Sequence, residues 1–187
     1  KWRNESVCLI CTKNLVKLAN QTKKKIHILH ITTAEEIELL NKNKKYVSYE
    51  VTPQHLVLSS PSCYDKLGTL AQMNPPIRSV RHNKRLRQAL KNNEIDIVGS
   101  DHAPHKLSEK KLEYPDSPSG LPGVQTLLPI LLNEVSKKMI SINNVVELTS
   151  YNPINRFKIK NKGLIKEGYD ADFTFVDMTK TKKISNK

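Results

Sequence analysis

Residues 95–105 read Ile-Asp-Ile-Val-Gly-Ser-Asp-His-Ala-Pro-His, and this stretch decides the predicted fold. Its first six residues are rich in β-branched side chains and predict a buried strand. The strand ends at Asp101, and Pro104 restricts the backbone between Asp101 and His105. A carboxylate at the end of a buried strand needs a metal ion or a cation as its partner. The stretch therefore predicts an α/β domain with a polar site at the carboxyl end of a strand.

Strand and helix patterns alternate on the N-terminal side of this stretch. Residues 26–29 and 46–51 read as strands, and residues 82–93 read as a helix. Thr33 and Glu36 form a capping box that predicts the start of another helix. Such alternation predicts parallel strands joined by helical crossovers. A complete eightfold barrel needs about 250 residues, so we expect roughly three of its units in this chain.

The remaining segments predict loops, helices and a small sheet. Residues 52–79 and 102–122 are rich in turn-forming residues and predict long loops. Residues 124–137 predict a helix kinked by Pro129, and residues 141–150 predict a shorter one. Alternation over residues 163–177 predicts short strands of a separate sheet. Residues 5–20 predict an amphipathic helix, and its apolar face is expected to bury Val7, Ile10, Cys11, Leu15 and Leu18.

The composition of the chain argues against a nucleic acid or a membrane as its binding partner. The net charge is +13, but only six of the 31 basic residues are arginine, so we expect no nucleic-acid partner. No apolar run approaches the roughly 20 residues that cross a membrane, and no membrane role is expected.

Three cysteines cannot form a disulfide framework, which favours the reducing cytoplasm. Cys8 and Cys11 are expected to be buried rather than metal-binding. The first residues resemble neither a signal peptide nor an initiator Met, so the chain is expected to begin inside a longer protein.

Two side chains follow strands at the position that catalytic groups take in α/β barrels. His30 follows residues 26–29, and Asp101 follows residues 95–100. A metal ion bound there would lower the pKa of water to about 7 and supply hydroxide at neutral pH. The alternatives are a His that caps or fills the core and an Asp that forms a turn.

Several motifs, in order, resemble those of dihydroorotases in the amidohydrolase superfamily. Asp101–His105 with Glu109-Lys110 is similar to the family's Asp-His-Ala-Pro-His…Glu-Lys. The other similar stretches are His27-Ile-Leu-His-Ile-Thr-Thr33, Glu50-Val-Thr-Pro-Gln-His-Leu56, Asn74-Pro-Pro-Ile-Arg78, Ser119-Gly-Leu-Pro-Gly-Val-Gln125 and Gly163-Leu-Ile-Lys-Glu-Gly-Tyr-Asp-Ala-Asp172. The resemblance covers nearly the whole chain. It implies a zinc-dependent hydrolase that interconverts N-carbamoyl-L-aspartate and dihydroorotate in pyrimidine synthesis.

The resemblance also implies roles for single residues. His30 would bind one zinc ion, and Asp101 would bind a second and move a proton between water and the ring nitrogen. Asn74 and His105 would hold the small-molecule substrate, together with the backbone around Ser119 and Gly120. His27 would be structural. Arg78 would contact substrate or anchor its loop, and Glu50 would either support the metal ligands or form a salt bridge.

Some family features cannot be placed in this sequence. Gln54 replaces the family's usual second His, and the His-x-His pair and the bridging residue of a two-zinc site are missing. The resemblance thus implies the C-terminal part of a TIM-like (β/α)8 metal-dependent hydrolase barrel over residues 1–157, and part of a small β-sandwich over 158–187. A truncated, inactive homologue and a hydantoinase remain alternatives. An incomplete barrel would expose apolar surface and self-associate, and a homo-oligomer or a pathway-enzyme partner is possible.

Overall fold

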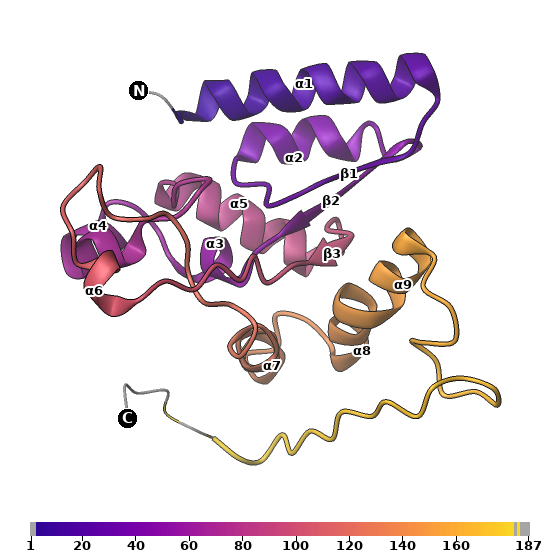
Figure 1. Cartoon of the computed structure of the whole chain (residues 1–187). Coiled ribbons are helices and arrows are strands. Elements are labelled where there is room, and N and C mark those ends of the chain that lie inside the picture. The colour runs from indigo at the N-terminus through magenta and orange to yellow at the C-terminus, as the bar shows by residue number, and fades with distance from the viewer. Residues whose placement is uncertain (1–2, 182, 184–187) are drawn as a thin grey trace.

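Three parallel strands form the centre of the structure, a computed structural model that describes residues 3–181 and 183 (Figure 1). They are β1 (Ile26–Ile28), β2 (Val47–Val51) and β3 (Ile97–Val98), and β2 lies between the other two. Ile28 pairs with Tyr49, and Glu50 pairs with Ile97. The predicted α/β class and the parallel strand direction are confirmed, although β3 is shorter than expected.

Helices connect and cover these strands. They are α1 (Glu5–Thr22), α2 (Ala34–Asn41), α3 (Pro53–Val57), α4 (Ser62–Leu67), the 3-10 turn η1 (Gly68–Ala71), α5 (Val80–Lys91), α6 (Leu107–Lys110), α7 (Leu127–Ser136), α8 (Ile142–Val146), the π-helical turn η2 (Glu147–Tyr151) and α9 (Asn152–Phe157). The prediction of a continuous loop over residues 52–79 is wrong, since α3, α4 and η1 lie there. The predicted loop over residues 102–122 is likewise interrupted, by α6. Pro129 lies in the first turn of α7, where a missing N–H costs no intrahelical bond, so it need not kink the helix.

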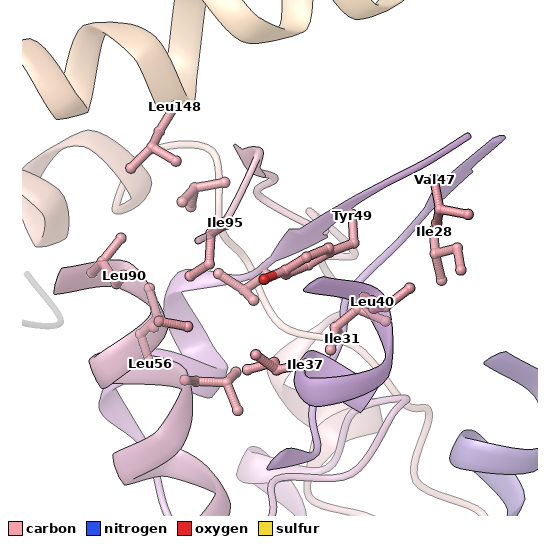
Figure 2. Close-up of a cluster of buried hydrophobic side chains, with 14 of the residues drawn as sticks. Ile28, Ile31, Ile37, Leu40, Val47, Tyr49, Leu56, Leu90, Ile95 and Leu148 are labelled. Atoms are coloured by element: carbon pink, nitrogen blue, oxygen red, sulfur yellow. The ribbon is translucent and has the colours of Figure 1, made fainter. Parts of the chain in front are cut away.

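The core lies between one face of the sheet and helices α2 and α5. Ile37, Leu40, Tyr49, Leu86 and Leu90 are each at most 2% exposed. Figure 2 shows Tyr49 of β2 among Ile37, Leu40 and Ile95. Full burial of such side chains contributes about 1.5–3 kcal/mol each. Because side chains alternate along β2, Ser48 and Glu50 point to the opposite face of the sheet.

Glu36 joins α1 to the start of α2. The residue is 4% exposed, and its carboxylate accepts a hydrogen bond from Thr12 Oγ1 of α1 at 2.7 Å. It also accepts from the Thr33 N–H at 3.1 Å, which completes the predicted capping box. One buried carboxylate therefore links two helices and fixes the chain just after His30.

The apolar face predicted for α1 is not buried. The side of the helix that packs inward carries Thr12, Val16 and Ala19. The larger apolar residues point to solvent, with exposed fractions of 50% for Val7, 58% for Ile10, 37% for Leu15 and 56% for Leu18. Cys11 is exposed, and the half-buried Cys8 accepts a hydrogen bond from Arg78 at 3.1 Å, so the expected burial of both cysteines is wrong. Small residues let α1 approach α2 closely, while its outer stripe has no covering element among residues 3–181.

This outer stripe of α1, defined by Val7, Ile10, Leu15 and Leu18, predicts self-association of the isolated chain. The double substitution Ile10→Lys and Leu18→Lys is expected to shift the chain toward monomer in light scattering coupled to size exclusion. The exposed polar pair Asn14→Lys and Gln21→Lys adds the same charge and serves as the control. A shift of equal size in the control would show that charge alone, and not the apolar stripe, governs association.

The described tail beyond α9 contains no strand. Residues 158–181 run along one side of the molecule (Figure 1), with a turn held by the Asp170 N–H on the Asn161 carbonyl at 2.8 Å. The predicted strands over 163–177 are therefore wrong, because a strand needs a hydrogen-bonding neighbour and none is present here. The assignment of residues 158–187, some of which lie outside the described residues, to a sandwich stays a prediction. No helix in the described part combines the length and apolar character that a bilayer crossing requires.

Candidate active site

His30 and Asp101 lie at the carboxyl ends of β1 and β3. Both have left-handed backbone, with φ of 41° at His30 and 43° at Asp101, a conformation that non-glycine residues rarely adopt. Both side chains are half-buried, and within residues 3–181 neither makes a hydrogen bond or an ion pair. Two strand spacings across β2 separate their backbones by about 10 Å. Strained backbone with unpaired polar side chains at one edge of a sheet is typical of a functional site.

Glu50 is paired with His27 beneath this edge. Their side chains are 13% and 5% exposed, and His27 Nε2 lies 3.1 Å from Glu50 Oε2. The other ring nitrogen of His27 lies 2.9 Å from Ser48 Oγ. A Cβ at Gly99 would come within 2.4 Å of Glu50 Oε1, so a larger residue there would displace this carboxylate. Glu50 is therefore held by a hydrogen bond to His27, a contact that becomes a salt bridge only when the imidazole is protonated.

The loop that contains Asn74 is anchored by a buried arginine. Arg78 donates through Nη1 to the Arg3 carbonyl at 2.7 Å and through Nε to Thr32 Oγ1 at 3.2 Å. The Arg3 side chain donates to Asn74 Oδ1 at 2.5 Å. Arg78 is 9% exposed and its donor nitrogens bind protein atoms, which favours the role of a loop anchor over contact with a substrate.

His55 supports the same loop from below. It is 3% exposed, its Nε2 donates to the Pro75 carbonyl at 3.0 Å, and its Nδ1 lies 2.7 Å from Thr52 Oγ1. Burial lowers the pKa of His55 to about 4, so the ring is neutral near pH 7. A carbonyl oxygen only accepts, which places the proton on Nε2. No sequence pattern predicts this contact between His55 and the Pro75 carbonyl.

The depressed pKa of His55 predicts loss of stability in mild acid. An unfolded His binds a proton near pH 6.5, whereas the folded site resists protonation until about pH 4. The free energy of unfolding should therefore fall as the pH drops from about 6.5 to about 4, by at most about 3 kcal/mol from this residue. Urea unfolding at several pH values checks this against His55→Gln, which lacks the titrating ring. Parallel curves for the two proteins would contradict the prediction.

His105, Ser119 and Gly120 lie together on the loops that follow β3. His105 Nε2 lies 3.2 Å from the Ser119 carbonyl, and His105 borders an open surface depression of about 300 Å³ with Glu109, Leu112, Asp116 and Pro118. Gly120 has φ of 148°, and a Cβ there would lie 2.7 Å from the Ala103 carbonyl. Only glycine allows this close approach. The Gly120 N–H donates to the Gln72 carbonyl at 3.0 Å, which ties these loops to the segment before Asn74.

The donors at the strand ends fit zinc in type but not in number. An imidazole nitrogen from His30 and a carboxylate from Asp101 are ligands that zinc accepts. Among the described residues no three His, Cys, Asp or Glu side chains gather closely enough to hold a metal ion. His30 and Asp101 could therefore supply at most part of a zinc coordination sphere.

The structure thus joins some predicted site residues and leaves others apart. Asn74 is connected through Gln72 to Ser119 and Gly120, and His105 contacts Ser119. No contact joins His30 to Asp101, because β2 lies between their strands. Gln72 and Lys110, which hold the loops together, were not predicted as site residues.

The fold is an α/β fold with parallel strands and helical crossovers. Its polar groups lie at the carboxyl ends of the strands, where many α/β enzymes have their catalytic residues. Residues 5–186 match the model of the amidohydrolase family, and the chain belongs to this family. It has an α/β amidohydrolase fold.

Similar proteins include dihydroorotases. The chain is 41% identical over 179 residues to the dihydroorotase of Methanosphaera stadtmanae, covering 95% of this chain and 41% of the relative. It is also 41% identical over 169 residues to the dihydroorotase of Pyrococcus abyssi, covering 90% and 40%. The chain therefore spans about two fifths of the length of these relatives.

Solved structures with a similar fold include hydantoinases. The L-hydantoinase (dihydropyrimidinase) of Arthrobacter aurescens superimposes with a TM-score of 0.83 at 28% identity, over 88% of this chain and 38% of that one. The dihydropyrimidinase of Brevibacillus agri gives a TM-score of 0.78 at 27% identity, over 86% and 37%.

Proposed function

We propose that this chain is part of a dihydroorotase-like hydrolase, which interconverts N-carbamoyl-L-aspartate and dihydroorotate in pyrimidine synthesis. The observation that supports this most is the pair of strained, unpaired side chains at the ends of β1 and β3, His30 and Asp101. The similarity to proteins named dihydroorotase points to the same substrate. We propose that the protein acts in the cytoplasm and that its binding partner is the small-molecule substrate.

The roles follow from the chemistry of each group. In the hydrolytic direction, the oxygen of water adds to the ring amide carbonyl, the carbon–nitrogen bond breaks, and the nitrogen takes up a proton. Asp101 removes the proton from water and delivers it to the leaving nitrogen. Two zinc ions, when bound with the help of His30 and Asp101, would supply water of lowered pKa and stabilise negative charge on oxygen. Asn74, His105 and the backbone at Ser119 and Gly120 hold the substrate in place.

The finer architecture belongs to the same proposal. We assign residues 1–157 to the last units of a TIM-like (β/α)8 barrel, supported by three parallel strands with helical crossovers. Residues 158–187 are assigned to part of a β-sandwich. The relatives are more than twice as long as the chain, so further ligands can come from parts of the fold that these residues do not contain.

A hydantoinase is the second candidate, because the similar solved structures bear that name. An inactive homologue is the third, because the described residues do not gather three metal ligands. Dihydroorotate carries a carboxylate that hydantoin lacks, so the two cyclic amides separate the first two candidates. Zinc content separates both from the third.

The test measures bound zinc and the hydrolysis of dihydroorotate and hydantoin by the purified full-length protein of which this chain is proposed to be part. We expect zinc to bind, dihydroorotate to be preferred, and turnover to disappear after chelation and return with added zinc. Preference for hydantoin would favour the second candidate. Absence of both zinc and turnover would favour the inactive homologue.

A further inference from the structure

Lys110 is a buried cation that the proposed chemistry does not use. It is the last residue of α6, and the residue is only 6% exposed. The neighbouring Lys111 is exposed to solvent. Lysine is seldom buried without a partner, because its ammonium loses hydration. A buried lysine beside the proposed substrate loops therefore needs an explanation.

The Lys110 ammonium connects two segments that flank the proposed substrate residues. Nζ donates to the Gln72 carbonyl at 2.8 Å and to the Pro118 carbonyl at 2.9 Å. Gln72 lies two residues before Asn74, and Pro118 directly precedes Ser119. One side chain thus holds both loops at a fixed separation.

Further hydrogen bonds around Lys110 connect the same two segments. The Lys110 carbonyl accepts from Thr69 Oγ1 at 2.7 Å and from Ser117 Oγ at 3.3 Å. The Gln72 side chain donates to the Ser117 carbonyl at 2.6 Å. The Gln72 carbonyl, already bound by the ammonium, also accepts the Gly120 N–H at 3.0 Å. Removal of the ammonium would loosen the carbonyl that orders Gly120.

Both Lys110 side-chain contacts are neutral. In the described part of the chain no carboxylate lies within ion-pair distance of its Nζ, and burial lowers the pKa of this lysine. The loss of hydration by this ammonium offsets much of what its hydrogen bonds to carbonyls contribute, so we expect little net stabilisation of the fold. The ammonium does constrain the positions of the two loops, because the Gln72 and Pro118 carbonyls must both lie at hydrogen-bond distance from Lys110 Nζ.

We propose that Lys110 is a positioning residue that fixes the Asn74 loop against the Ser119–Gly120 loop, and so sets the width of the substrate site. The link to substrate rests on the proposed function. The link between the two loops does not, because it depends only on the contacts of Lys110.

The test compares Lys110→Met, Lys110→Arg and the exposed control Lys111→Met in the full chain. In Lys110→Met we expect the Gly120 amide to exchange hydrogen about tenfold faster, while amides of α2 keep their rates, since a lost hydrogen bond of about 1.4 kcal/mol corresponds to a factor of ten. The KM for dihydroorotate should rise about tenfold with little change in kcat, which marks a loss of substrate binding. Lys110→Arg should restore much of both values, and Lys111→Met should change neither.

Unchanged exchange at Gly120 in Lys110→Met would overturn the proposal. So would equal loss of protection in Lys111→Met, or an unchanged KM in an active Lys110→Met protein. If the unsubstituted full-length protein shows no turnover, the proposed function fails, but the exchange rates still decide whether Lys110 joins the two loops.

Discussion

Asp101→Asn is expected to reduce the turnover of dihydroorotate by about 10²–10⁴-fold, the range that a positioned general base contributes. The amide has nearly the same shape as the carboxylate but cannot accept a proton from water. It also lacks the charge that favours metal binding. Measurement of kcat and of bound zinc on the same preparation separates the loss of the base from the loss of the metal.

Asp65→Asn is the matched control, because Asp65 is an exposed aspartate on α4. It should leave kcat unchanged. Normal turnover by Asp101→Asn, in a preparation that hydrolyses dihydroorotate, would refute the role assigned to Asp101. Circular dichroism of both variants checks that the fold is retained.

Glu36→Ala should have the largest effect on stability, lowering the free energy of unfolding by about 3 kcal/mol. The truncation leaves the N–H of Thr33 and the hydroxyl of Thr12 without their buried acceptor, and each such loss costs about 1–3 kcal/mol. The capping box of α2 is also lost. Urea unfolding should show a midpoint lowered by more than about 1 M.

Glu38→Ala provides the comparison on the same helix. Glu38 is exposed and pairs with Arg85 at 2.7 Å, and exposed ion pairs contribute at most about 1 kcal/mol. A small shift for Glu38→Ala beside a large one for Glu36→Ala is the expected result. Equal shifts would mean that the links of Glu36 to Thr12 and Thr33 add nothing to stability.

Much of the sheet could be predicted from the sequence, because β-branched runs and capping residues act locally. The strand before Asp101 and the start of α2 at Thr33 were found in this way. The helices of the 52–79 segment were missed, since five or six residues are too few to show a helical period. The face of α1 was predicted the wrong way round, because periodicity identifies an apolar stripe but not which side meets another element.

The predicted site residues could be found by motif and by their place at strand ends. Lys110 and His55 also stand in quoted motifs, but the contacts by which they hold the loops together could not be predicted. Lys110 meets Gln72 across 38 positions of sequence, and His55 meets Pro75 across 20. Both contacts end on backbone carbonyls, which every residue possesses. No pattern of side chains can indicate such a partner, so only the folded chain reveals it.

The left-handed backbone at His30 and Asp101 has a consequence for protein engineering. Glycine adopts such angles without the penalty of about 1–2 kcal/mol that other residues incur. A library selected for heat resistance alone should therefore enrich His30→Gly and Asp101→Gly, and sequencing of the survivors checks this. Those variants would be more stable but would lack both proposed metal ligands. Thermostability and catalysis therefore favour different residues at the same two positions.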